Sequence, residues 1–293
     1  MERREYFYTL TSRGELIHDG AVMDDAAFLD FFFKRIQPNT SGIHQDYVYY
    51  SPCGPEWCFV ACADTPVVFT RLHEKRLWYA PSLAVEFTPR DLRFSPEGVL
   101  YHRSPVGQWG RVTAQVAAEL SQHIHTWGAW YFYDNGTDVP EVIAPLTMPE
   151  HTVLMRPREG NACAGCGRDN KNGLHLSFLF NSQSHTAECW LHPDGRYMGS
   201  LGVMHGGYVA MLLDETMGKV LSGLQRKAPT AQLNIRYTKP VILGRELYLK
   251  GEILREEGRK NFLRGTIAYS DEPDTILAEA EALFLTIRPP SQS

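Results

Sequence analysis

The stretch from Met204 to Gly218 combines residue types and a spacing that could support catalysis. A His-Gly-Gly turn at 205–207 precedes an apolar segment with Asp214 in its middle. At about 3.6 residues per turn, a helix here would place Asp214 on the packed face and turn Glu215 and Lys219 away from it. Burying an unpaired carboxylate is costly, so Asp214 is interpreted as either a structural hydrogen-bond acceptor or a general base. The residues that share its face are Gly207, Ala210, Met211, Gly218 and Leu221.

The glycine turn before this segment could stabilise a developing negative charge. Backbone N–H groups at a helix N-terminus lack intrahelical partners and lie at the positive end of the helix dipole. Glycine also lets a ligand approach the backbone closely. Gly206 and Gly207 are therefore candidate oxyanion donors, with His205 as a side-chain donor, whereas the alternative is a plain tight turn.

The chain that must position these residues has 293 residues, which is long enough for two domains. With 43% hydrophobic, 12% aromatic and 22% charged residues, its composition is that of a soluble globular protein. A net charge of -5 provides no basic field for a phosphate backbone, so nucleic acid is not an expected partner. No apolar run approaches the ~20 residues of a spanning helix, so no membrane insertion is expected.

The N-terminal residues and the cysteines indicate a reducing compartment. Residues 1–10 lack the apolar core of ~7–15 residues found in a secretory signal. Glu2 and Glu5 argue against an acid-poor transit peptide, so the cytoplasm is the expected location and the mitochondrion the alternative. Six cysteines in a chain of this length predict reduced thiols rather than a disulfide framework.

The spacing of cysteines and histidines predicts no metal site. The three cysteines between Ser51 and Cys62 fit no common zinc pattern and are interpreted as buried small side chains. His123 and His125 alternate but lack a nearby third ligand. Cys163 and Cys166 have the spacing of half a zinc site, yet no second Cys or His pair follows, so they are assigned to a capping loop.

Local patterns in the first half predict mixed α and β structure. Residues 6–11 and 16–18 form a hairpin signal, and 26–36 carries aromatic side chains at helical spacing after two acids. Short β-rich runs separated by Pro, Gly and Asp follow. A short helix is expected at 114–120 and a strand at 127–133.

The second half predicts one long helix against an antiparallel sheet. A hairpin is expected from 174–180 and 185–191, which flank a polar turn. A strand follows the helix from Ala231, and three long strands lie at 245–255, 261–270 and 276–287. Apolar and polar residues alternate along much of them, so one sheet face should be covered and the other exposed. The predicted fold class is α+β.

Three motifs in this half together resemble the hotdog-fold thioesterase superfamily, in its phenylacetate-degradation-type branch. They are the His-Gly-Gly turn with Asp214 nine positions after the His, the strand region 231–244 (Ala-Gln-Leu-Asn-Ile-Arg-Tyr-Thr-Lys-Pro-Val-Ile-Leu-Gly), and the segment 163–174 (Cys-Ala-Gly-Cys-Gly-Arg-Asp-Asn-Lys-Asn-Gly-Leu). The resemblance implies a hotdog fold, in which the sheet wraps the helix. It also implies an acyl-CoA thioesterase that releases a carboxylic acid and coenzyme A.

The resemblance also implies how the site is built. Asp214 takes the role of base or nucleophile, beside the glycine turn. Thr230 occupies the place where members carry a Ser or Thr beside the acid, and it either orients the water or only begins a strand. Some relatives carry an Asn or Gln six positions before the His, but this chain has Gly199 there. Family members assemble as homodimers or dimers of dimers, with the helix and glycine turn of one site from different subunits.

Coenzyme A would be the handle of the substrate, and no other cofactor is expected. Arg236, Lys239 and Arg245 lie on or beside the strands and are candidates to bind its 3′-phosphate. The alternative for these three side chains is plain solvation, which is usual for basic residues on exposed strand faces.

The first half resembles an uncharacterised eukaryotic family of unknown function. The resemblance rests on 6–8 (Tyr-Phe-Tyr), 28–35 (Phe-Leu-Asp-Phe-Phe-Phe-Lys-Arg), 51–54 (Ser-Pro-Cys-Gly) and 64–69 (Asp-Thr-Pro-Val-Val-Phe). It implies a separate domain with no evident active site. We expect an α+β domain at 1–143, a Pro-punctuated linker at 144–158 and the hotdog domain at 159–293.

Two other functions compete with thioester hydrolysis. A hotdog enoyl-CoA hydratase would place its acid and histidine at a different spacing from the glycine turn. A non-catalytic acyl-CoA-binding or scaffold protein would have its function in the N-terminal domain.

Overall fold

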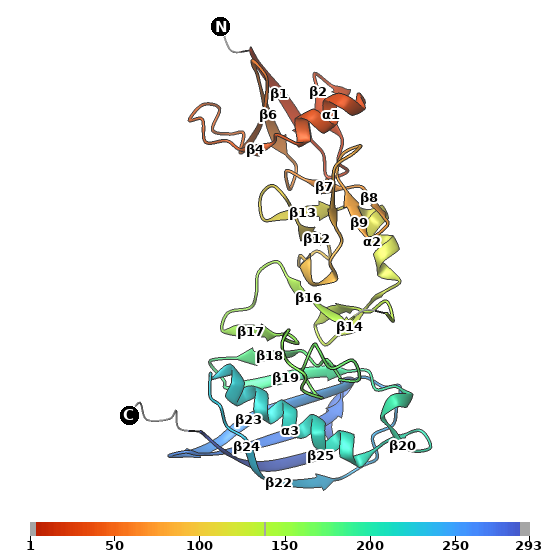
Figure 1. Ribbon diagram of the computed structural model, residues 1–293, viewed down its shortest axis with the longest axis vertical. Helices are drawn as coiled ribbons and strands as arrows, with labels where there is room; N and C mark the ends of the chain where they lie inside the picture. Colours follow the sequence, from red (N-terminus) through yellow and green to blue (C-terminus); the bar gives the residue numbers. More distant parts are fainter. Residues whose placement is uncertain (1–3, 138, 288–293) are drawn as a thin grey trace. The chain divides into compact units, whose positions relative to one another are not determined.

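The computed structural model describes residues 4–137 and 139–287, and the chain divides into two compact units (Figure 1). The first unit runs to His125 and includes 133–135 and 143–147, whereas the second comprises 126–132, 136–142 and the chain from Met148 onward. The stretch 144–158, predicted as a linker, contains the end of β16 (Glu141–Pro145) and all of β17 (Thr152–Met155). The division at 1–143 and 159–293 stays a prediction.

The first unit begins with a six-stranded mixed sheet that packs against helix α1 (Ala26–Phe33). The strand order is β3-β2-β1-β6-β5-β4, in which β1 runs parallel to β6. The expected hairpin and aromatic helix are confirmed, and Asp25 caps the helix by accepting a hydrogen bond from the Phe28 N–H. The strands are β1 (Arg4–Leu10), β2 (Leu16–His18), β3 (Ala21–Val22), β4 (Gln37–Pro38), β5 (Tyr49–Cys53) and β6 (Glu56–Cys62).

Shorter strands and a second helix complete the elements before the long sheet. The expected short helix is confirmed as α2 (Ala114–Ser121). The segment 127–133, predicted as a single strand, contains parts of two, because Gly128 with φ 57° turns the chain between them. The elements are β7 (Val68–Phe69), β8 (Arg71–His73), β9 (Arg76–Trp78), β10 (Ala84–Glu86), η1 (Pro89–Asp91), β11 (Leu92–Phe94), β12 (Leu100–Arg103), β13 (Trp109–Val112), β14 (Ile124–Trp127) and β15 (Trp130–Tyr133).

The second unit is built on a seven-stranded antiparallel sheet in the order β17-β18-β19-β23-β24-β25-β22. The three expected long strands are confirmed. The predicted strand at 174–180 is shorter than expected, because Leu174 and Leu176 donate backbone hydrogen bonds to the loop carbonyls of Ala164 and Gly165. The remaining elements are β18 (Phe178–Asn181), β19 (Thr186–Leu191), η2 (Gly195–Tyr197), β20 (Met198–Ser200), β21 (Val203–Met204), β22 (Thr230–Tyr237), β23 (Leu247–Glu257), β24 (Lys260–Tyr269) and β25 (Glu272–Leu285).

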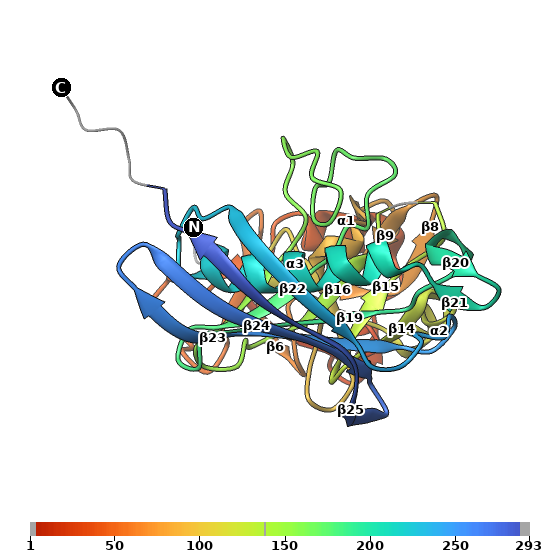
Figure 2. The ribbon, with the colours of Figure 1, turned by 90° about the horizontal axis from the view of Figure 1, so that it is seen from below.

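Helix α3 (Gly206–Gly223) lies along the covered face of this sheet, so the hotdog arrangement is confirmed (Figures 1 and 2). Small residues cross the sheet in register beneath the helix: Ala187 pairs with Gly251, Gly251 with Gly265, and Gly265 with Ala280. This row lets the helix backbone approach closely. No helix among residues 4–137 and 139–287 is long and apolar enough to span a membrane.

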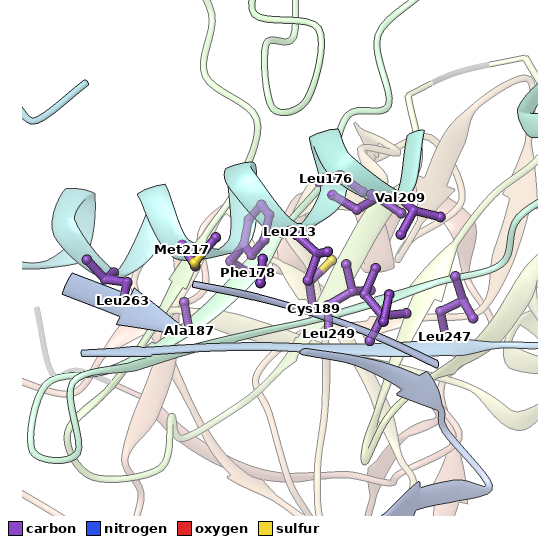
Figure 3. Close-up of a cluster of buried hydrophobic side chains, with 14 of the residues drawn as sticks. Leu176, Phe178, Ala187, Cys189, Val209, Leu213, Met217, Leu247, Leu249 and Leu263 are labelled. Carbon is purple, nitrogen blue, oxygen red and sulfur yellow. The ribbon is translucent and has the colours of Figure 1, made fainter. Parts of the chain in front are cut away.

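The packed face of α3 differs from the prediction. Leu213 and Met217 point into the core toward Ala187, Leu249 and Leu263 of the sheet (Figure 3). The buried residues of α3 are Val209, Leu212, Leu213, Thr216, Met217, Val220 and Leu221.

Asp214 is only partly buried and lies beside this face, so its placement on the packed side was wrong. Glu215 and Lys219, expected to turn away from the packed face, have side chains only 17% and 14% exposed. Apolar residues of α3 lie on more than one side of the helix, since Ala210 and Met211 are apolar but are not buried. The spacing of apolar residues alone therefore did not define the packed face.

Replacing Gly251 with alanine should destabilise the second unit. A Cβ there would lie 2.8 Å from the backbone oxygen of Thr216, which cannot move without shifting α3. We expect Gly251→Ala to lower the free energy of unfolding by about 1–3 kcal/mol, measured by chemical denaturation. Gly218→Ala is the control: its Cβ would be 3.8 Å from Phe284, and alanine favours a helix interior. Equal stability of the two variants would contradict the close approach.

Candidate active site

The glycine turn forms the N-terminus of α3, with His205 as the N-cap residue. The His205 backbone is extended and donates a hydrogen bond to the Tyr197 carbonyl at 2.8 Å, which fixes the start of the helix. Its side chain accepts a hydrogen bond at Nδ1 from the Gly207 N–H at 2.9 Å. This bond occupies the Gly207 N–H that the sequence analysis assigned to an oxyanion. Within the described part of the chain, the Gly206 N–H has no hydrogen-bond partner and remains available.

A cavity of about 300 Å³ lies beside the N-terminus of α3. Gly206 and Val209 line it from α3, and Tyr237 and Lys239 line it from β22 and the turn that follows. The Tyr237 hydroxyl donates to the Gly206 carbonyl at 3.1 Å. The cavity therefore sits where a ligand could reach the Gly206 N–H.

Asp214 and Thr230 are brought together as the resemblance implied. The Thr230 hydroxyl donates to Asp214 Oδ1 at 2.6 Å. Thr230 begins the edge strand β22, whose register against β25 shifts between Thr230 and Gln232, a bulge that can re-aim a side chain. Thr230 is exposed, and one oxygen of Asp214, Oδ2, accepts no hydrogen bond among the described residues.

Within one chain, the glycine turn and Asp214 are too far apart to act on one carbonyl group. Gly206 and Asp214 are eight residues apart on the same helix, which at 1.5 Å per residue is about 12 Å along its axis. An oxyanion donor must lie within about 3 Å of the oxygen that it stabilises, and a base must reach the attacking water. Within one copy, the Gly206 N–H and the Asp214 carboxylate therefore cannot act on the same carbonyl group.

Position 199 has no room for a polar side chain. Gly199 lies in β20, and a Cβ there would be 2.7 Å from the Cα of His205. The Asn or Gln found in some relatives would require this backbone to move. This protein therefore lacks a polar side chain at that position.

The three basic residues predicted to bind a phosphate differ in their surroundings. Lys239 lines the cavity beside Gly206. Arg236 is exposed and lies 3.8 Å from Glu279. Arg245 binds Asp271 and Glu272 at 2.8 and 2.9 Å, so its charge is already paired.

A second polar cluster, missed by the sequence analysis, lies on another side of α3. The Cys163 and Cys166 thiols and the Glu215 carboxylate lie within 4.8 Å of one another, the spacing that metal ligands require. Lys219 lies among them, with Nζ 2.7 Å from Cys166 Sγ and 3.0 Å from Glu215 Oε1. The signal was the i,i+4 spacing of Glu215 and Lys219, which predicts an ion pair on a helix.

Burial and Glu215 control protonation in this cluster. Burial, together with the hydrogen bond that the thiol donates to Glu215, raises the pKa of the Cys166 thiol to about 12. Burial alone would lower the pKa of Lys219, but the charge of Glu215 and the contact with Cys166 raise it overall. Near neutral pH Cys166 is therefore a neutral thiol and Lys219 a charged ammonium.

Two family models match separate parts of the chain. Residues 1–134 match a family described as a domain of unknown function (DUF4505), and residues 201–271 match the thioesterase superfamily. The second match contains the glycine turn, Asp214 and Thr230.

The chain is similar to acyl-coenzyme A thioesterase THEM4 from Mus musculus, at 38% identity over 42% of this chain and 53% of that protein. It is 31% identical to THEM4 from Rattus norvegicus over 40% of this chain and 50% of that protein. The chain spans about half the length of the curated relatives it matches.

Two solved structures resemble the chain more distantly. A thioesterase superfamily protein aligns at a TM-score of 0.40 and 23% identity, over 58% of this chain and 73% of its own. The protein smu.793 from Streptococcus mutans UA159, bound to acetyl CoA, aligns at 0.34 and 21% identity, over 36% of this chain and 82% of its own.

Cys166 should resist alkylation in the folded protein. A pKa of about 12, against about 8.5 for an ordinary thiol, leaves roughly 10³-fold less of the reactive thiolate at pH 8. We expect iodoacetamide to label the partly exposed Cys163 before Cys166. Mass spectrometry of peptides measures the labelling of each cysteine over time. Unfolding in urea should make both cysteines reactive. Preferential labelling of Cys166 in the native protein would contradict its burial as a neutral thiol.

Proposed function

We propose that this protein is an acyl-CoA thioesterase, which hydrolyses a thioester to a carboxylic acid and coenzyme A. The observation that carries the proposal is the hydrogen bond that Thr230 donates to Asp214. Asp214 lies on the helix that begins at the glycine turn, where the Gly206 N–H has no partner among the described residues. The match of residues 201–271 to the thioesterase superfamily supports it, because it includes all of these groups.

Asp214 acts as general base on a water molecule in this mechanism. Thr230 occupies Oδ1 and so fixes the carboxylate, which leaves Oδ2 to accept the proton. The water oxygen forms a bond to the thioester carbon, and the carbonyl oxygen becomes an oxyanion that the Gly206 N–H stabilises. When the carbon–sulfur bond breaks, the thiolate of coenzyme A leaves and takes up a proton.

The complete site belongs to two copies of the chain in this proposal. Asp214 and Thr230 come from one copy and the glycine turn from the other, because about 12 Å of helix separates the two groups within a copy. The exposed edge strand β22 carries Thr230 and offers unpaired backbone groups for such an assembly. A homodimer is the smallest assembly that completes the site, and a dimer of dimers contains the same unit.

The coenzyme A portion is proposed to bind beside the glycine turn. The cavity of about 300 Å³ there is large enough for part of a thioester, and Lys239 supplies a positive charge at its wall. Arg236 remains a candidate to bind the 3′-phosphate. Arg245 could bind it only by breaking its ion pairs with Asp271 and Glu272. The N-terminal domain is proposed to be accessory to this chemistry.

Replacing Asp214 with asparagine should nearly abolish turnover without unfolding the protein. Loss of a positioned base typically costs ~10²–10⁴ in rate. The measurement is release of free thiol from a panel of acyl-CoA substrates, beside Glu281→Gln, which removes an exposed carboxylate from β25. Hydrolysis by Asp214→Asn within a few-fold of wild type would refute the role of the acid.

The same panel separates the competing functions. Hydration of an enoyl-CoA without thiol release would indicate a hydratase. Binding of acyl-CoA without any turnover would indicate a non-catalytic protein. Either result in the wild-type protein would replace the proposed activity.

Thr230 should affect the rate more than substrate binding. Thr230→Val keeps the shape but removes the hydroxyl that fixes Asp214, and we expect kcat to fall by about tenfold, the loss of one hydrogen bond to a charged group. Thr230→Ser is the matched control, since it retains the donor, and should keep most of the activity. A valine variant with normal kcat would leave Thr230 as only the first residue of a strand.

A further inference from the structure

A small polar cavity of about 170 Å³ lies in the second unit, away from the glycine turn. It is enclosed by the chain that follows β17, the 163–176 loop and the C-terminal half of α3. The side chains that line it include three cations and no carboxylate. Its polar and ionic lining groups are Arg156, Arg158, Asn161, Cys166, Lys219 and Ser222.

The positive charge around this cavity is only partly balanced. Arg156 lies 3.8 Å from Glu141, but Arg168 binds the same carboxylate. Lys219 pairs with Glu215. Arg158 has no carboxylate within 4.0 Å in the part of the chain that the structure describes. Among the described residues, Arg158 is therefore the cation of this cavity whose charge no carboxylate balances.

The arrangement suits an anion better than a metal cation. Cys163, Cys166 and Glu215 could converge on a metal, but the Lys219 ammonium already lies 2.7 Å from Cys166 Sγ and 3.0 Å from Glu215. A divalent ion there would meet this ammonium, and like charges at such distances repel strongly. An anion in the cavity would instead meet Arg158, which no described carboxylate balances, with Arg156 and Lys219 on the same lining.

We propose that this cavity binds a phosphate group. The guanidinium group of Arg158 offers a planar pair of donors that matches phosphate oxygens, and Arg156, which also donates to the Val142 carbonyl, and Lys219 add positive charge. The Ser222 hydroxyl and the Asn161 amide are neutral donors on the same wall. A volume of about 170 Å³ is below the ~300–1,000 Å³ of drug-sized ligand sites, so it takes one group rather than a whole acyl-CoA.

The phosphate site is distinct from the proposed catalytic acid. Lys219 follows Asp214 by five residues, which turns it by about 140° around the helix axis. The two residues therefore face different surroundings, Asp214 toward β22 and Lys219 toward the 163–176 loop. The group that binds is either free orthophosphate or the 3′-phosphate of coenzyme A, which share the same chemistry. In the second case this cavity takes the 3′-phosphate in place of Arg236.

The first test measures orthophosphate binding by isothermal titration calorimetry at constant ionic strength. Arg158→Ala removes an exposed side chain whose backbone bridge to Gly167 is unaffected, so the fold should persist. We expect its affinity for orthophosphate to fall by about tenfold, the usual loss for one charge-assisted contact. Arg255→Ala is the matched control, because it removes an exposed arginine of β23 that does not line the cavity, and its affinity should equal that of wild type.

The second test compares coenzyme A with dephospho-coenzyme A, which differ only in the 3′-phosphate. If the bound phosphate is that of coenzyme A, coenzyme A should bind the wild-type protein about tenfold more tightly than dephospho-coenzyme A does. Arg158→Ala should abolish this difference. If the site takes free orthophosphate instead, coenzyme A and dephospho-coenzyme A should bind with equal affinity, and orthophosphate binding should still depend on Arg158. The proposal is overturned when neither orthophosphate binding nor the preference for coenzyme A changes in Arg158→Ala. These are binding measurements, so their outcome is independent of whether the protein hydrolyses thioesters.

Discussion

The close packing of α3 on its sheet is the constraint on which the rest of the second unit depends. The row of small residues through Gly251 and Gly265 lets the helix backbone come into contact with the strands, and a Cβ at Gly251 would meet the Thr216 carbonyl. With the depth of the helix fixed, its rotation is set by Leu213 and Met217, which fill the space above the row. Every polar group on α3 takes its position from this rotation.

Two sets of polar groups lie on different sides of the buried face. Asp214 meets Thr230 at the edge strand, where the surroundings are exposed. Glu215 and Lys219 meet Cys163 and Cys166 under a loop, where burial is strong enough to hold a thiol neutral. Asp214 and Glu215, which are adjacent in the sequence, therefore experience different environments. The partly buried carboxylate of Asp214, which keeps one oxygen without a hydrogen bond among the described residues, is the one suited to activate water.

Much of this fold could be predicted from sequence, because strand alternation and the apolar helix are local signals. The pairing of Asp214 with Thr230 was accessible only through the resemblance, since no spacing rule joins residues on a helix and a later strand. The helix face was mispredicted because Ala210 and Met211 are apolar yet lie outside the core. The engagement of the Gly207 N–H by His205 depends on a side-chain rotamer, which sequence does not encode locally.

The geometry of α3 also bears on the proposal that two copies of the chain share one site. A straight helix keeps its N-terminal N–H groups and an acid at its ninth position about 12 Å apart, whatever the side chains do. Bringing them to one carbonyl within a chain would require breaking the helix, and with it the packing over Gly251. A second copy avoids that cost, because β22 places Thr230 and the adjoining Asp214 at an open sheet edge. The packing that stabilises the fold thus favours a site shared between subunits.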